Sequence, residues 1–456
     1  MKTTYLYFAA ALAMLSACST NEEYETVTNN GLQKVTFADP FVGKGLTKAS
    51  GDITTDGSNG TSALTKFKVK VWGNLIGSNS STAPDVKGSY TQQTTEAPFY
   101  NGDVILHNGT TWSSTKEYYY PRDKYYYRFA AFAPADALEG DGAISVSMDP
   151  NYQTFSGASA LAYGVSNVPL VQEIDNTADT KKGWDLLVSN RVLSSPSTDG
   201  ISDRTAISFT FQHILSRLSF YVYTTEPTET TVKVKSIKAY LPKGAAGQYR
   251  QNNDTDRPTA ETQDNNQTSP NEGNNYNSKN SSWNSATNDS WEWTSGFSDI
   301  TNVVTPTDFD EKVVNPANNG TNTYTEYTVE NSESTVTHAA TFSAAKDNSS
   351  ITKIGKEYFL APTPANTTEV AKYHFFVKVE YSVTKNSITK DYIGYINLYD
   401  ADFYRFKQGW HHKLYLNLSS KKIRFISAEV SGWENTEHKE DMTVSREVEG
   451  WTAEQN

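Results

Sequence analysis

Short runs in which apolar and polar residues alternate are the feature that most restricts how this chain can fold. In Leu64–Gly77, for example, Phe67, Val69 and Val71 alternate with three lysines. Successive residues of a β-strand point to opposite faces, so this pattern predicts a half-buried strand. Similar short runs occur at Trp184–Val192, Ala206–Tyr223, Val232–Pro242, Glu357–Pro362, Tyr373–Val383, Asp391–Leu398, Trp410–Leu418 and Lys422–Trp433. Because no long segment combines helical periodicity with good capping signals, the sequence predicts an all-β protein built of sandwiches.

A tyrosine-rich stretch, Lys116–Pro134, has the pattern of a hairpin that turns at Pro121–Asp123. Rows of tyrosines occur in sugar-binding and base-stacking proteins. They occur more often where strands lined with aromatic side chains pack across a sheet. We therefore expect these tyrosines to be structural.

A long polar segment interrupts the strand pattern. Gln251–Ser295 contains no Val, Ile, Leu, Met or Phe, and its large apolar side chains are Trp283, Trp291 and Trp293. Such a composition buries too little apolar surface to offset the entropy of ordering. We expect a surface insertion, about residues 243–350, which the tryptophans could pin to the body.

The single cysteine, Cys18, lies at the end of an N-terminal export signal. Lys2 precedes a short apolar run, Tyr5–Leu15, which is followed by the small residues Ser16 and Ala17. This run is too short to span a membrane, which takes about 20 residues. The stretch resembles a bacterial lipoprotein signal, in which residues 1–17 are removed and Cys18 is acylated, with palmitate among the acyl chains. A plain signal peptide with a chance cysteine is the alternative.

The sequence lacks the familiar signatures of catalysis and metal binding. None of the H-E-x-x-H, G-x-S-x-G, P-loop or G-x-G-x-x-G motifs is present. His411 and His412 are adjacent and would face opposite sides of a strand, and His213 has the setting of a hydrogen-bonded core histidine. The net charge of −12 with scattered basic residues argues against nucleic-acid binding. We therefore predict no enzyme activity, no metal site and no cofactor.

Several segments in a fixed order resemble the fimbrillin family, the lipoprotein-derived subunits of type V pili. They follow the lipoprotein signal and are Val71–Asn74, Tyr125–Pro134, Asp185–Asn190, Phe209–Val222, Gly409–Leu418 and Ala428–Asn435. The resemblance implies two tandem transthyretin-like β-sandwich domains, with the long polar insertion in the second. It also implies that a trypsin-like protease cuts after a basic residue in the loop behind the first strand. A strand of a neighbouring subunit then fills the groove that the first strand leaves.

Carried onto this sequence, the resemblance gives a set of boundaries. The removable strand lies around Val35–Phe41, within a tether and propeptide at residues 18–48. Cleavage falls between Lys48 and Ala49, with Lys44 as the alternative; the loop contains no arginine. The two sandwiches cover residues 49–200 and 201–435.

The C-terminal residues 436–456 supply a candidate donor strand. Met442, Val444 and Val448 lie on one face of an alternating run, and Trp451 follows it. A strand of ten residues is ~33 Å long, enough to cross a small sandwich. An extra strand within the same domain and a frayed terminus are the alternatives.

Two functions remain open from the sequence. The chain is a pilin that polymerises by strand donation to other copies of itself or to related pilins and supports adhesion. Alternatively, it is an anchored lipoprotein of the cell surface or outer membrane, a pilus tip or anchor, or a glycan-binding protein that uses exposed aromatics such as Trp283, Trp291 and Trp293.

Overall fold

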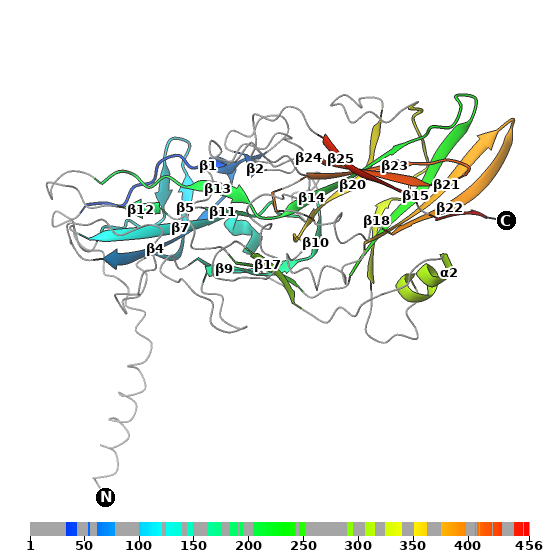
Figure 1. Cartoon of the computed structure of the whole chain (residues 1–456). Coiled ribbons are helices and arrows are strands. Elements are labelled where there is room, and N and C mark those ends of the chain that lie inside the picture. Colours follow the sequence, from blue (N-terminus) through cyan, green and yellow to red (C-terminus); the bar gives the residue numbers. More distant parts are fainter. Residues whose placement is uncertain are drawn as a thin grey trace, which may run out of the picture.

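Strands are the dominant secondary structure of the described part of the chain in the computed structural model. This part comprises residues 33–42, 53–54, 62–77, 100–120, 125–138, 144–148, 163–174, 183–189, 192–194, 204–242, 246–250, 290–294, 306–314, 324–339, 351–362, 375–397, 406, 408–409, 411–421, 423–430, 442–449 and 451–455. The molecule is elongated, with the N-terminal strands at one end and the C-terminal strands at the other (Figure 1). The all-β fold predicted from the alternating runs is confirmed.

An eight-stranded sheet, here called the N-terminal sheet, forms the first half. Its order is β1-β13-β11-β7-β4-β5-β6, and β12 pairs with β7. Its aromatic-rich core includes Phe67, Tyr100, Phe129 and Phe211. Next to it lie the short pair β2 and β3 and two 3₁₀ turns, η1 and η2. The bounds are β1 Phe41–Val42, β2 Ile53–Thr54, β3 Ser62–Ala63, η1 Leu64–Lys66, β4 Val69–Gly77, β5 Tyr100–His107, β6 Trp112–Ser114, β7 Tyr126–Ala133, η2 Ala135–Leu138, β11 Leu187–Ser189, β12 Val192–Ser194 and β13 Thr210–His213.

A four-stranded sheet, the junction sheet, lies beside the N-terminal sheet. Its order is β17 (Ser290–Thr294), β16 (Ala246–Arg250), β9 (Tyr163–Pro169) and β8 (Ser145–Met148). A separate core joins its Tyr249 and Trp291 to Phe132 of the N-terminal sheet and to Phe359 of the second half. This shared core ties the two halves of the molecule together.

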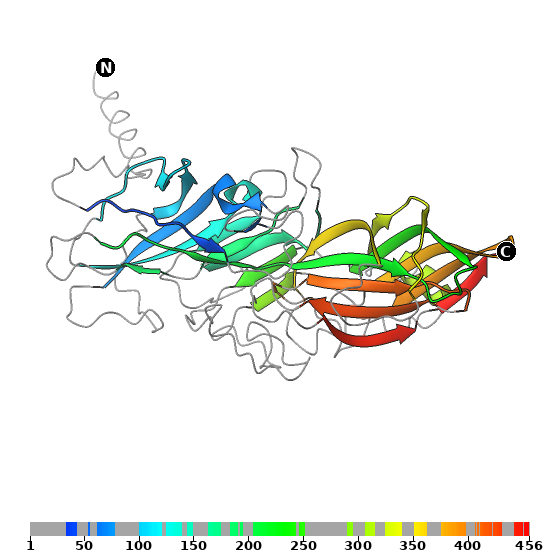
Figure 2. The ribbon, with the colours of Figure 1, turned by 90° about the horizontal axis from the view of Figure 1, so that it is seen from above.

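Two facing sheets form the second half as a β-sandwich (Figure 2). One has the order β10-β20-β14-β23-β24-β25, and the other β18-β15-β21-β22-β26 with β19 beside β15. Their inward residues, such as Phe220, Val234 and Leu416, make one large core. The bounds are β10 Val171–Glu173, β14 Ser216–Tyr223, β15 Thr231–Pro242, β18 Tyr324–Glu330, β19 Ser334–Thr335, β20 Thr352–Leu360, β21 Phe376–Lys385, β22 Ile388–Asn397, β23 His411–Asn417, β24 Arg424–Val430, β25 Met442–Glu449 and β26 Trp451–Gln455.

The run Ala206–Tyr223 contributes one strand to each half. β13 belongs to the N-terminal sheet and β14 to the sandwich, with Ile214 and Leu215 fully buried between them. The domain limits at residues 200 and 201, and the transthyretin-like character of each half, remain predictions.

The polar insertion contains more structure than its composition predicted. β16 and β17 pair with each other, and β16 also pairs with β9. Trp291 packs on Tyr249 at a ring distance of 5.5 Å and is 1 % exposed. A Cβ on Gly247 would lie 2.8 Å from the Trp291 ring, so this close packing requires glycine. Trp291 therefore pins the insertion and is not one of the exposed aromatics expected of a binding surface.

A short helical segment covers the outer face of the second sandwich sheet. It consists of α2 (Pro306–Phe309) and a π-helical turn, η3 (Asp310–Val314). Phe309 and Val313 are buried against Tyr240, Phe376 and Tyr395. The two apolar residues, four apart, fall on one helical face and bury it on the sheet.

The prediction of a hairpin at Lys116–Pro134 is wrong. Among the described residues, Tyr119 pairs with Lys34, whereas β7 pairs with β4, β11 and β12. The predicted turn, Pro121–Asp123, lies outside the described residues. The structural role of the tyrosines is confirmed, because Tyr120 and Tyr127 are buried with ring centroids 5.0 Å apart.

Candidate functional site

The segment Gln33–Val42, here called the N-terminal segment, follows β13 and the residues just before it. The Ala38 N–H donates to the Ile207 carbonyl at 2.9 Å, and the Ile207 N–H returns a bond to Thr36 at 2.9 Å. The Phe41 N–H donates to Phe209 at 2.8 Å, and from there β1 runs parallel to β13. One edge of the segment is thus hydrogen-bonded over most of its length.

The other edge of the N-terminal segment is hydrogen-bonded as well. The Val35 N–H donates to the Tyr118 carbonyl at 2.8 Å, and the Tyr120 N–H donates to Gln33 at 2.9 Å. Antiparallel bridges join Lys34 to Tyr119 and Phe37 to Trp112 of β6. Since β1, at one end of the N-terminal sheet, belongs to the segment and β6 is at the other end, the segment closes that sheet on itself.

The side chains of the N-terminal segment complete the core of this sheet. Val35, Phe37, Pro40 and Val42 are buried, whereas Lys34, Thr36 and Asp39 are exposed. The strict alternation is therefore shifted by one residue between Phe37 and Pro40. Burying a Val or Phe side chain contributes about 1.5–3 kcal/mol. The apolar side chains and the backbone bonds together hold the segment firmly.

Phe37 lies at the point where the sheet closes. Its ring meets the Tyr100 ring edge-on at 5.9 Å and stacks on Phe209 at 6.2 Å. Tyr100 in turn lies 4.0 Å from Tyr118, centroid to centroid, and burial raises the pKa of its hydroxyl. This aromatic group spans both edges of the segment.

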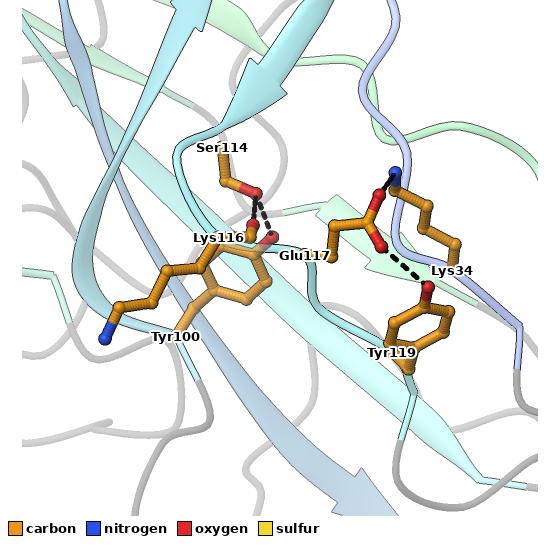
Figure 3. Close-up of polar contacts among 6 residues, drawn as sticks. All are labelled: Lys34, Tyr100, Ser114, Lys116, Glu117 and Tyr119. Atoms are coloured by element: carbon orange, nitrogen blue, oxygen red, sulfur yellow. Dashed lines mark hydrogen bonds and ion pairs between the residues drawn. The ribbon is translucent and has the colours of Figure 1, made fainter. Parts of the chain in front are cut away.

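An exposed polar cluster flanks the start of the segment (Figure 3). The Lys34 ammonium lies 2.5 Å from Glu117 Oε1, and the Tyr119 hydroxyl donates to Glu117 Oε2 at 2.9 Å. Hydrogen bonds from Lys34 and Tyr119 lower the pKa of Glu117. In the same view, the Ser114 hydroxyl donates to the Lys116 carbonyl and lies 3.4 Å from the Tyr100 hydroxyl.

The chain is anchored again soon after the segment. Ile53 is 2 % exposed in the same core, and its N–H donates to Asp185 Oδ2 at 2.8 Å. Asp185 Oδ1 lies 2.8 Å from His213 Nδ1, and both side chains are buried. The expectation that His213 is a hydrogen-bonded core histidine is confirmed. Sequence reasoning did not connect Asp185 with it, because the two are 28 residues apart.

The sequence-predicted modification and processing residues lie outside the described residues. These are Cys18, Lys44, Lys48 and Ala49. Their roles remain predictions. The flanking fixed points, Val42 and Ile53, are described, and each is 2 % exposed.

The candidate donor strand pairs within its own chain. β25, which contains Met442, Val444 and Val448, is antiparallel to β24. β26 begins at Trp451 and is antiparallel to β22. The tail thus runs from the edge of one sandwich sheet to the edge of the other (Figure 2). The tail is therefore arranged as in the alternative named above, an extra strand within the same domain. Donation to a neighbouring subunit stays a prediction.

A second polar cluster, not found from the sequence, lies on the first sandwich sheet. Arg217 Nη2 donates to Glu357 Oε2 at 2.7 Å, and the Ser219 hydroxyl bridges Glu357 and His411. Burial alone would raise the pKa of Glu357, but Arg217 and Lys353 hold it below the ordinary value. Burial likewise lowers the pKa of His411. The cluster satisfies buried charges across three strands, which is a structural role.

His411 and His412 have different surroundings, as expected for adjacent residues that face opposite sides of β23. His411 joins the Glu357 cluster, whereas the His412 ring lies 5.3 Å from Phe406. No group of three or more His, Cys, Asp or Glu side chains suited to a metal ion occurs within the described ranges. In the same residues, no helix has the length and apolar character needed to cross a membrane.

Comparisons with known proteins give one family. The model of the Fimbrillin-like family matches residues 80–355, more than half of the chain. No curated protein matches the sequence significantly. A fimbrial protein from Bacteroides vulgatus is 15 % identical with a TM-score of 0.43, covering 88 % of this chain and 99 % of that one.

Two further solved structures are more distant. The fimbrial anchor protein Mfa2 from Porphyromonas gingivalis is 9 % identical with a TM-score of 0.24, covering 86 % of this chain and 97 % of its own. A fimbrial assembly protein from Parabacteroides distasonis is 9 % identical with a TM-score of 0.26, covering 79 % and 87 % respectively.

Proposed function

Because the chain belongs to the fimbrillin-like family, which has a pilus-related structural role at the cell surface, we propose that it is a pilin of a fimbria that supports adhesion. It is exported as a lipoprotein acylated on Cys18, is cut before Ala49 and polymerises by strand donation between subunits. The lipid holds the precursor at the outer membrane, where each buried methylene contributes about 0.8 kcal/mol.

The observation that carries this proposal is the position of the N-terminal segment between two strand edges. It is bonded to Ile207 and Phe209 on one side and to Tyr118 and Tyr120 on the other. Withdrawal of the segment would leave these backbone groups unpaired and the core around Phe209 uncovered. A strand from another subunit restores both, because strand addition combines main-chain hydrogen bonds with pockets for alternate side chains.

The geometry on either side of the loop supports processing at Lys48. Val42 pairs with Phe211 of β13, and Ile53 is bonded to Asp185, whose partner His213 is two residues further along the same strand. The ten residues 43–52 can extend to roughly 33 Å, so they have ample length to join these neighbouring points and still present Lys48 or Lys44 to a trypsin-like protease. The Ile53 anchor would keep the new N-terminus on the body after the cut.

The tail supplies the donor. β25 and β26 occupy the outer edges of the two sandwich sheets, in the half of the molecule that does not contain the N-terminal segment. Release of this tail into the groove of another subunit is a head-to-tail contact that does not close on itself, and such contacts grow filaments.

N-terminal sequencing and intact-mass measurement of the protein recovered from the cell surface test the proposal. We expect a chain that begins at Ala49, or just after Lys44. The double variant K44A/K48A should retain its N-terminal segment, whereas K66A, an exposed lysine of η1, should be processed normally. A surface protein that begins at acylated Cys18 would contradict the pilin role and support an anchor, tip or binding lipoprotein.

A further inference from the structure

We propose that the groove left by the N-terminal segment accepts a strand of the pattern basic–aliphatic–x–aromatic–x–x–apolar–x–apolar, supplied by a partner subunit other than a copy of this chain. The inference rests on the strand exchange proposed above.

The burial of the resident segment defines four sites. Val35, Phe37, Pro40 and Val42 are buried, and the residues between them are exposed or half-buried. The spacing of two, three and two residues results from the shift in alternation after Phe37. A replacing strand must repeat this spacing, because a slip of one residue would turn its apolar side chains outward.

The Phe37 site is the most demanding of the four. It is walled by Tyr100, in edge-on contact at 5.9 Å, and by Phe209, stacked at 6.2 Å. Both are at most 2 % exposed, and Trp112 pairs with Phe37 from β6. A smaller side chain in this position would leave a cavity between aromatic rings, and well-packed central aromatic sites dominate the energy of interfaces.

The first position of the pattern, held by Lys34 in the resident segment, favours a basic residue. Lys34 pairs with Glu117 at 2.5 Å, and Tyr119 directs its hydroxyl to the same carboxylate. An acidic residue at this position would face Glu117 directly. The repulsion between the two carboxylates would weaken the binding of such a strand and slow its association.

This chain's own tail does not fit the four sites in the direction of the resident segment. Placing Met442 and Val444 at the sites of Val35 and Phe37 puts Glu447 and Glu449 at the sites of Pro40 and Val42. It also puts Asp441 beside Glu117. Two carboxylates would then enter apolar sites, which is costly without compensating partners.

The other registers of Thr436–Asn456 are no better. Placing Val448 at the Val35 site leaves Gly450 at the aromatic site. In the reverse direction, Ala453, Trp451 and Val448 fill three sites, but Arg446 occupies the fourth and Glu454 faces Glu117. Reversal would also turn the parallel pairing with β13 into antiparallel pairing. The tail is therefore better suited to the groove of a different subunit.

A peptide-exchange experiment on the full chain tests this inference. A specific protease site replaces residues 44–48, the chain is cut there, and labelled peptides compete with the N-terminal segment. The reference peptide is Gln33–Val42, and the tail peptide is Thr436–Asn456. Variants of the reference carry F37A, K34E or T36A, the last at an exposed position as the matched control.

We expect the reference and T36A peptides to exchange in, and the tail peptide to bind about tenfold more weakly or worse. The F37A peptide should bind about a hundredfold more weakly, and K34E a few-fold more weakly with a deficit that shrinks at high salt. If the tail peptide binds as tightly as the reference, the hetero-partner inference is overturned while strand exchange stands. If the reference peptide itself does not exchange, the proposed function fails with it.

Discussion

The two ends of the described chain are both extended and hydrogen-bonded to neighbouring strands, but they are held differently. The N-terminal segment is bonded along both edges and buries four side chains in one core. In the described structure, β25 pairs only with β24 and β26 only with β22, and Ala453, Glu454 and Gln455 are exposed. This difference fits the proposed exchange, in which the N-terminal segment leaves only after a cut and the tail strands are released from one edge.

The largest expected effect comes from the aromatic site of the N-terminal segment. F37A should lower the free energy of unfolding by about 3–5 kcal/mol, because it removes a buried ring between Tyr100 and Phe209. Chemical denaturation measures the loss, and T36A, at an exposed position of the same segment, is the control. Equal stability of the two variants would show that the segment is not part of the core.

A smaller loss is expected at the anchor behind the processing loop. D185A leaves the Ile53 N–H and the His213 ring without their buried carboxylate. We expect about 1–3 kcal/mol of destabilisation and faster hydrogen exchange at Ile53. D136A, at a partly exposed aspartate of η2, serves as the control. Unchanged exchange at Ile53 would argue that the anchor does not limit how far the chain opens.

The tail should be easier to loosen. Thr452 Oγ1 accepts the Ile423 N–H at 2.8 Å, so T452A should cost about 1 kcal/mol. Hydrogen exchange should rise over 451–455, with the N-terminal segment unaffected; Q455A, at an exposed residue of the same strand, is the control. Donation of the tail to a partner subunit should be at least as fast as with the parent chain, whereas deletion of Thr436–Asn456 should abolish it. Unimpaired assembly after the deletion would disprove donation by the tail.

The smallest effect concerns the exposed ion pair at the start of the N-terminal segment. Because Lys34 and Tyr119 lower the pKa of Glu117, the pair stabilises the folded chain above the ordinary glutamate pKa, near 4.3. This contribution is lost as the pH falls through the lower folded-state value. NMR titration of the Glu117 carboxyl should give a depressed pKa that K34M returns toward normal. An identical titration in the parent and K34M would exclude the pair.

Much of the strand content could be predicted from residue patterns. The alternation of Phe67, Val69 and Val71 identified β4, and similar runs identified β14, β15 and β21 to β24. Local alternation suffices there because each of these strands buries a face rich in Val, Ile, Leu or aromatic residues. The short strands β16 and β17 were missed, since their sequences, AGQYR and SWEWT, have five residues each. They pair with each other, and β16 also pairs with the distant strand β9.

The candidate site, too, could be predicted only in part from residue patterns. The sequence by itself determined that Val35 and Phe37 lie on one face of a strand, that the tail alternates, and that the chain is all-β, because side-chain periodicity is a local property of the backbone. Only the tertiary structure decided which edges these strands occupy. The partners of the N-terminal segment, Tyr118 and Ile207, are 83 and 172 residues away from Val35 along the chain. Backbone N–H and C=O groups are the same at every residue, so pairing over such distances is decided by how the cores pack and not by the local sequence.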